Sequence, residues 1–188
     1  MALPEGLVEI GLQAFEDSGL ESVALPSTVL RVFPGAFCRC GRLRTAALNE
    51  GLEALGVDVY LDGYLAHRLA YRGVFEGSAL EDVRLPSTLR RIEYRTFYQC
   101  YRLRSVRLPE GLEYLGERCF YYSGLLEICL PRSLRRIGYS IFGYDAPLRA
   151  VHVAEGCGAD VLGQVGKRVV VSVVSGASEW LAQSFWWI

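Results

Sequence analysis

The chain has 188 residues, of which 51% are hydrophobic and 22% are charged, a composition typical of a folded domain and not of a disordered segment. Its formal net charge is −1 and Lys167 is its only lysine, so we expect no broad basic surface and no nucleic-acid partner. No apolar stretch approaches the roughly 20 residues that cross a bilayer, and the opening MALPEGLVEIG lacks the pattern of a signal peptide. Localisation stays open, with an intracellular protein or a piece of a longer one favoured.

The first unit of an internal repeat begins at Leu3, and Leu-Pro-x-x-Leu or a close variant recurs along the chain. The successive spacings are 22, 23, 37, 23, 22 and 23 residues, and the long one becomes 22 if about fifteen residues between Gly56 and Arg72 are an insertion. Units that read LPEGL alternate with units that read LPSTL, which indicates duplication of a two-unit block of 45 residues. The units begin at Leu3, Leu25, Leu48, Leu85, Leu108 and Leu130, and a degenerate seventh begins at Val153.

Each unit predicts two short strands and an anchor. In LESVALP, LEDVRLP and LRSVRLP the valine and the following leucine share one parity, so both face the core from one strand. The proline ends that strand, a Glu-Gly or Ser-Thr pair turns the chain, and a second run such as LRRI or LEYL returns it. A phenylalanine then fills the other side of the coil, at Phe15, Phe37, Phe75, Phe97, Phe120 and Phe142.

Stacking of such units at about 4.8 Å builds one continuous core of parallel strands. The pattern resembles the BspA-like, or Treponema pallidum type, leucine-rich repeat family, whose units read LPxxLxxIGxxAFxxCxxLxxV. The match runs from Leu3 to about Val153. The resemblance implies a curved solenoid without catalytic residues and a role in adhesion or protein interaction.

The predicted fold class is therefore a leucine-rich-repeat solenoid of mainly short parallel β-strands with turns and short helical segments. We expect a right-handed coil of about six to seven turns. Residues 1–153 would form the repeats, with an insertion at 57–71, and residues 154–188 would form the degenerate last repeat and an aromatic tail.

Two stacked sets of side chains are predicted to point outward. In the returning run, the charge alternates in sign from unit to unit, which predicts a ladder of ion pairs; an arginine-rich binding strip is the alternative. On the strands that precede the Leu-Pro motif, Arg84 and Arg107 are candidate partner-binding residues in a mixed polar strip. The other interpretation is that these side chains are simply exposed to water. The ladder would contain Glu53, Arg90, Glu113 and Arg135. The alternative arginine-rich strip would contain Arg90, Arg91, Arg135 and Arg136. The mixed polar strip would also contain Asp82, Glu127 and His152.

The insertion VDVYLDGYLAHRLAY is the first break in the repeat. Asp62-Gly63 favours a hairpin, whereas the spacing of its aromatic residues favours one face of a helix. Because insertions in solenoids form loops that often bind partners, these residues are candidate contacts, with extra packing as the alternative. The candidates are Tyr60, Tyr64, His67 and Tyr71.

The tail SGASEWLAQSFWWI is the second break, and its apolar side chains are costly to leave in water. Three roles stay open: a cap on the coil, docking on another protein, or contact with a membrane surface. The candidate partner-binding residues are Trp180, Phe185, Trp186 and Trp187.

The sequence contains no complete motif for catalysis or metal binding. Cys38 and Cys40 are close in sequence, but no second cysteine pair or nearby histidine completes a metal or redox site. The two histidines, His67 and His152, lie in different elements, and no nucleophile or phosphate-loop motif occurs. We therefore expect no cofactor, no metal and no enzymatic activity, and we interpret the six cysteines as reduced, buried thiols.

The function that the sequence favours is a non-catalytic protein–protein interaction module or a scaffold subunit of a larger assembly. Its partner would be another protein of unknown identity. The alternative is a fragment of a cell-surface adhesin.

Overall fold

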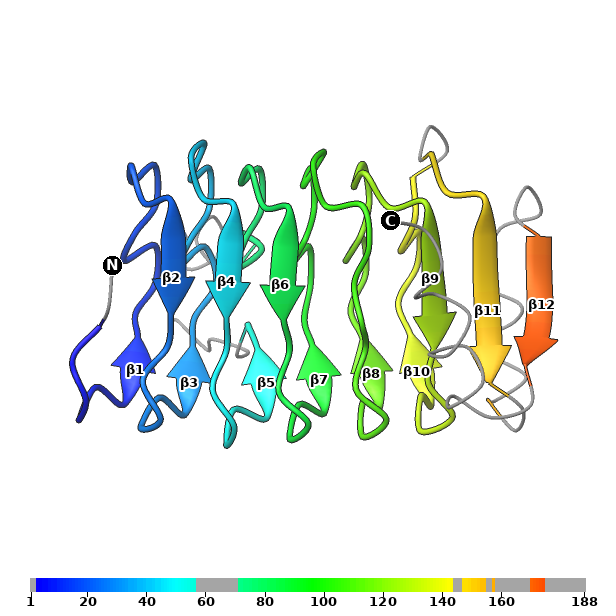
Figure 1. Ribbon diagram of the computed structural model, residues 1–188, viewed down its shortest axis with the longest axis horizontal. Helices are drawn as coiled ribbons and strands as arrows, with labels where there is room; N and C mark the ends of the chain where they lie inside the picture. Colours follow the sequence, from blue (N-terminus) through cyan, green and yellow to red (C-terminus); the bar gives the residue numbers. More distant parts are fainter. Residues whose placement is uncertain (1–2, 57–70, 144–146, 155–156, 158–169, 175–188) are drawn as a thin grey trace, which may run out of the picture.

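The computed structural model is a coil in which every strand pairing is parallel (Figure 1). It describes residues 3–56, 71–143, 147–154 and 157, and the backbone of 170–174. Two lines of strands run along the coil axis, which confirms the predicted parallel-strand solenoid of about six turns.

The first line contains the longer strands and forms two three-stranded sheets. One sheet consists of β2 (Ser22–Ala24), β4 (Thr45–Ala47) and β6 (Asp82–Arg84); the other consists of β9 (Glu127–Leu130), β11 (Ala150–Ala154) and β12 (Val170–Val174). Equivalent repeat positions lie in register, with Val23 beside Ala46 and Ala46 beside Val83. These central residues are buried and their neighbours point outward, as the parity of the sequence predicts.

The second line contains the two-residue strands of the returning run and forms one six-stranded sheet in the order β1-β3-β5-β7-β8-β10. Its inward residues, such as Ile10, Val32 and Leu55, are paired in register and buried. The strands are β1 (Glu9–Ile10), β3 (Arg31–Val32), β5 (Ala54–Leu55), β7 (Arg91–Ile92), β8 (Tyr114–Leu115) and β10 (Arg136–Ile137).

A stack of phenylalanine rings closes the third side of the coil, as predicted. Successive ring centroids from Phe15 to Phe142 lie 5.3, 5.4, 5.7, 5.3 and 6.2 Å apart, and adjacent planes differ by at most 18°. The four central rings are fully buried. Offset stacking of this kind adds to the free energy gained from apolar burial, so the stack joins neighbouring turns as well as filling the core.

The segments around the phenylalanines are turns, and no helix occurs in the part of the chain that the structure describes. The predicted short helical segments are therefore not found there. In most units a residue two positions before the phenylalanine, or two positions after it, has a positive φ, as at Gln13 (52°) and Asp17 (56°). A right-handed helix cannot continue through a left-handed residue, so the chain makes two tight reversals around each ring.

The alternation of LPEGL and LPSTL has a direct structural cause. The carboxylate of Glu50 accepts hydrogen bonds from the amide (3.1 Å) and hydroxyl (2.9 Å) of Ser87 on the next turn. The hydroxyl of Thr88 accepts a hydrogen bond from the Gly51 amide and donates one to the Leu52 carbonyl, both at 3.0 Å. The first block repeats this pattern between Glu5, Gly6, Leu7, Ser27 and Thr28. The two-unit block is thus a hydrogen-bonded structural pair.

Replacement of Phe97 by alanine tests the importance of the ring stack. Because this side chain is fully buried between Phe75 and Phe120, we expect a loss of about 3–5 kcal/mol in the free energy of unfolding, measured by urea denaturation. Tyr139→Ala is the control, since Tyr139 is 71% exposed and its loss should change stability by less than about 0.5 kcal/mol. Equal effects of the two replacements would contradict the stack.

Candidate binding surfaces

The structure describes three of the residues that the sequence singled out for partner binding. Arg84, in β6, and Arg107, at the same repeat position on the next turn, are exposed on the outer side of the line of longer strands, which we call the strand face. Tyr71 is 47% exposed and lies elsewhere, edge-on to Tyr94 with 5.8 Å between ring centroids. The other candidates lie outside the described residues: Tyr60, Tyr64, His67, Trp180, Phe185, Trp186 and Trp187.

Arg84 and Arg107 occupy the same repeat position on successive turns, and both line one groove on the strand face. The groove has a volume of about 710 Å³. The buried side chains of Val83, Val106 and Leu108 contribute an apolar part of its lining. The structure thus brings these two predicted site residues together, on a surface with both charged and apolar groups.

The groove coincides with an interruption of the sheet. The sequence LRSVRLP predicts a strand through Ser105, yet residues 102–108 belong to none of the strands that the structure describes. Among the described residues, the backbone amides of Ser105, Val106 and Arg107 make no backbone hydrogen bond. The segment pairs with neither β6 nor β9, so the line of longer strands is interrupted on both sides of it. On the β6 side, Arg107 follows Arg84 at the same repeat position, and like charges on adjacent strands disfavour close pairing.

Arginines on the strand face differ in their pairing along the coil. Arg42 pairs with Glu21, while Arg44 and Arg102 both pair with Glu81. Four other exposed guanidinium groups of this face make no ion pair or side-chain hydrogen bond within the described part of the chain. These groups belong to Arg84, Arg104, Arg107 and Arg149, which we call the arginine strip.

Sequence analysis did not single out Arg104 and Arg149. A signal was present, because the outward position just before each strand reads Glu21, Arg44, Glu81 and Arg104, alternating in sign, and then Leu126 and Arg149. The alternation that supplies each arginine with an acidic neighbour ends at Leu126. The net charge follows the same trend: residues 1–83 contain six arginines and twelve carboxylates, and residues 84–154 contain twelve arginines and six carboxylates.

The residues of the predicted charge ladder stack in register through their backbones, but their charged side chains do not pair as predicted. The amide of Arg90 donates to the carbonyl of Glu53, and the amide of Glu113 donates to that of Arg90, each at 2.8 Å, so these residues stack in register. The guanidinium of Arg90 instead donates to the Gly111 carbonyl at 2.9 Å. Within the described residues no ion pair links the side chains of Glu53, Arg90, Glu113 and Arg135, so the predicted pairs are not formed.

Tyrosines gather beside the phenylalanine stack and form a second candidate surface. Tyr98 stacks on Tyr121 with 5.8 Å between centroids, and Tyr121 meets Tyr122 edge-on at 4.5 Å. The guanidinium carbon of Arg95 lies 3.7 Å from the centroid of the Tyr98 ring. Tyrosine and arginine suit interfaces, but here each ring is partly covered by its neighbours, so these tyrosines cover the outside of the ring stack.

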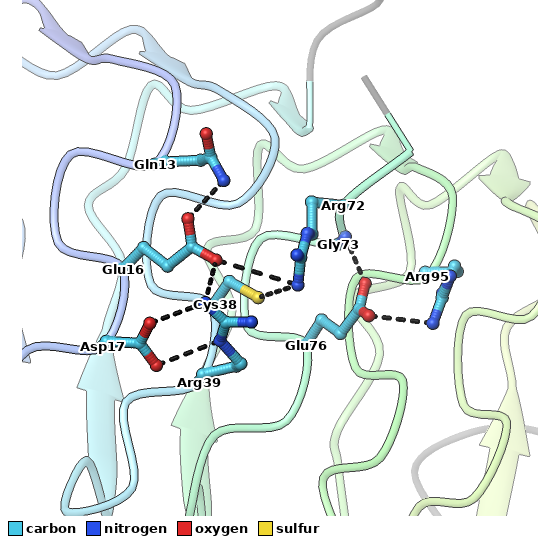
Figure 2. A network of polar contacts seen from close by, with 9 residues as sticks. All are labelled: Gln13, Glu16, Asp17, Cys38, Arg39, Arg72, Gly73, Glu76 and Arg95. Atoms are coloured by element: carbon cyan, nitrogen blue, oxygen red, sulfur yellow. Dashed lines mark hydrogen bonds and ion pairs between the residues drawn. The ribbon is translucent and has the colours of Figure 1, made fainter. Parts of the chain in front are cut away.

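Cys38 lies in a polar network (Figure 2). Cys40 instead belongs to the hydrophobic core. Arg72 approaches the Cys38 sulfur at 3.6 Å, while the Cys40 thiol donates to the Phe15 carbonyl at 3.0 Å. Burial, and then the charge of Glu76, raises the pKa of the Cys38 thiol to about 11, and burial raises that of Cys40. The two sulfurs thus make different contacts in their protonated form, which does not suit a shared metal or redox site.

The carboxylates of this network are held by arginines. Arg95 binds Glu76 at 2.8 Å, the Gly73 amide donates to the other Glu76 oxygen at 3.0 Å, and Arg39 binds Glu16 at 2.9 Å (Figure 2). Glu76 is buried, so its charge depends on these partners. Across the described part of the chain, no cluster of three potential metal ligands occurs and no helix has the length and apolarity needed to cross a membrane.

The geometry defines a leucine-rich-repeat solenoid, and comparison with known proteins gives the family. The model of the BspA type leucine-rich repeat region matches six copies over residues 1–66 and 70–158. The chain therefore belongs to the BspA-type leucine-rich repeat family, as its sequence predicts. Proteins with such repeats are generally non-catalytic and act in protein interaction or at surfaces.

Solved structures with the same fold come from several bacteria. A leucine-rich repeat protein from Bacteroides ovatus is 22% identical with a TM-score of 0.67, covering 92% of this chain and 38% of that one. The Treponema pallidum leucine-rich repeat protein is 22% identical with a TM-score of 0.62, covering 89% and 84%. The pneumococcal vaccine antigen PcpA is 20% identical with a TM-score of 0.60, covering 88% and 39%.

These likenesses show the fold alone. The chain spans about two fifths of the Bacteroides ovatus and pneumococcal proteins. Among curated proteins, none matches this sequence significantly.

Alkylation of the cysteines tests whether any of the four buried thiols is reactive. Because burial raises the pKa of Cys38, Cys40, Cys100 and Cys119, the native protein at pH 8 should react with iodoacetamide at these positions about tenfold or more slowly than the urea-unfolded chain. Peptide mass spectrometry assigns the sites. Fast modification of native Cys38 would instead indicate an activated thiolate.

Proposed function

We propose that this chain is a non-catalytic module that binds another protein through the strand face of its coil. The groove between β6 and β9 is the centre of this surface, and the observation that carries the proposal is the meeting of Arg84 and Arg107 there. Two exposed guanidinium groups without acidic partners in the described chain lie over an apolar floor at the one interruption of the described strand line.

The arrangement of the strand face supports binding. Its outward side chains are in register from turn to turn, so a partner would meet a regular surface supported by a rigid core. Arginine is over-represented at the centres of interfaces, where desolvation strengthens its hydrogen bonds. A scaffold subunit would use the same surface, since a partner held there leaves the rest of the coil available for further contacts.

The non-catalytic part of the proposal rests on the polar groups of the described residues. The buried carboxylate Glu76 is fully engaged by Arg95 and the Gly73 amide, and the described cysteines face the core or carry raised pKa values. The ring of His152, the one histidine in the described chain, is largely covered and lies 3.6 Å from the exposed carboxylate of Glu127. General acid–base or nucleophilic catalysis requires a poised group within reach of a second one in a cleft, and this surface offers no such pair.

Site-specific photo-cross-linking tests the proposed binding surface. Ser105 lines the groove and is exposed, so benzoylphenylalanine at this position should form a discrete adduct with a protein of the native source. The same reagent at Tyr139, an exposed residue of the turn before Phe142, is the control and should give no such adduct. Adducts at both positions, or at neither, would contradict binding through the strand face.

A fragment of a cell-surface adhesin is the second candidate. One similar structure is described as a leucine-rich cell-surface protein from Faecalibacterium prausnitzii, at 18% identity and a TM-score of 0.53 over 81% of this chain. An adhesin would bind through the same strand face, but the protein would lie outside the cell. Labelling of intact source cells with a membrane-impermeant amine or carboxyl reagent separates the two, because only a surface protein would be modified.

A further inference from the structure

We propose that the arginine strip binds an acidic, extended segment of a partner protein. This inference rests on the proposed protein-binding function and adds the chemistry of the partner. The strip consists of Arg84, Arg104, Arg107 and Arg149, all exposed on the strand face.

The fold brings these four residues from three turns onto one surface. Arg84 ends β6, and Arg107 has the same repeat position on the following turn. Arg104 and Arg149 belong to a second column, since the Leu126 amide donates to the Arg104 carbonyl at 3.1 Å and the Arg149 amide donates to the Leu126 carbonyl at 2.7 Å. The two columns run side by side along the coil axis, so the guanidinium groups form a strip and not a single point.

Asp82 and Glu110 line the groove beside Arg84 and Arg107, yet among the described residues no arginine of the strip forms an ion pair. Other arginines of the strand face do form such pairs, since Arg44 and Arg102 both pair with Glu81. Adjacent like charges destabilise neighbouring strands, so carboxylates from outside would remove a repulsion and form charge-assisted hydrogen bonds. The fork of a guanidinium group matches a carboxylate in geometry as well as in charge.

The groove adds two features that suit a polypeptide. Its apolar lining from Val83, Val106 and Leu108 can bury the aliphatic part of a bound side chain. The amides of Ser105, Val106 and Arg107, in the segment between β6 and β9, make no backbone hydrogen bond within the described chain. In an extended peptide, alternate side chains on one face recur about every 6.6 Å, which lets successive carboxylates reach successive arginines.

A nucleic acid fits this surface less well than an acidic peptide. Duplex DNA carries one charge per about 1.7 Å of axis and needs a continuous positive surface. The acidic side chains of Asp82, Glu110 and Glu127 interrupt the surface around the strip. A peptide can place neutral residues against these carboxylates, whereas a phosphate backbone cannot.

The test uses the full chain and a fluorescent synthetic peptide of repeating Glu-Ser, with a Gln-Ser peptide as the uncharged probe. Fluorescence anisotropy at low ionic strength should show saturable binding of the Glu-Ser peptide, at least about tenfold tighter than the Gln-Ser peptide and weakened at about 0.5 M NaCl. Arg107→Glu should weaken this binding about tenfold or more. This variant should fold at least as stably as the parent chain, because it places a carboxylate beside Arg84.

Arg136→Glu is the matched control, since it makes the same charge change at an exposed arginine of β10, in the six-stranded sheet of the returning run. It should leave peptide binding within about twofold. Equal weakening by both variants would overturn the proposal, because only net charge would matter. Tighter binding of a DNA duplex or heparin than of the peptide would overturn it in favour of another polyanion.

Absence of peptide binding is distinguishable from failure of the proposed function. If the Ser105 cross-linker captures a protein while the Glu-Ser peptide does not bind, the strand face is an interface but its partner is not an acidic segment. If neither occurs, both proposals are wrong.

Discussion

Contact between equivalent residues on successive turns is the interaction on which the whole molecule depends. One turn of this coil has too few apolar side chains to enclose a core, so each turn buries its valines, leucines and phenylalanine against the turns before and after it. The consequence is seen in the ring stack, where Phe37, Phe75, Phe97 and Phe120 are fully buried although each belongs to a short, irregular segment. Stability therefore accumulates along the coil instead of residing in one central cluster.

The same register determines what the surface can do. Side chains at one repeat position form a column along the coil, so the sign of each charge matters mainly through its neighbours on adjacent turns. Where Glu21, Arg44 and Glu81 follow one another, the charges are paired within the chain. Where Arg84 is followed by Arg107, the described residues form no ion pair with either guanidinium group, and the sheet is interrupted at that point. A repeat that keeps its core constant can thus create a binding surface by changing only its outward residues.

Much of this architecture is predictable from the sequence because its causes are local and repeated. The parity seen at Val23 and Leu25 and the recurring phenylalanine are visible six times and the repeat proline five times, so the strands, turns and core follow from the pattern. The left-handed turns are not predictable in the same way. Arg39, Arg95 and Tyr122 adopt positive φ although these residue types have no preference for it, so the stacked turns and not local propensity determine their conformation.

The proposed binding surface is predictable from the sequence only in part. Arg84 and Arg107 follow from the strand parity. Arg104 becomes notable only when the structure shows that Glu81, its neighbour in the column, pairs with Arg44 and Arg102 instead. The pairing of β12 with β11 is another feature that no repeat motif signals, since Val170–Val174 follows Ala150–Ala154 after a segment without the Leu-Pro pattern.

Amide hydrogen exchange of the free protein tests whether the line of longer strands is open at Ser105–Arg107, the site of the proposed binding surface. We expect the amides of Ser105, Val106 and Arg107 to exchange much faster than those of the equivalent residues Thr45–Ala47, although both segments lie well inside the coil. Equal protection of the two segments would mean that the strands pair continuously and that no such opening exists.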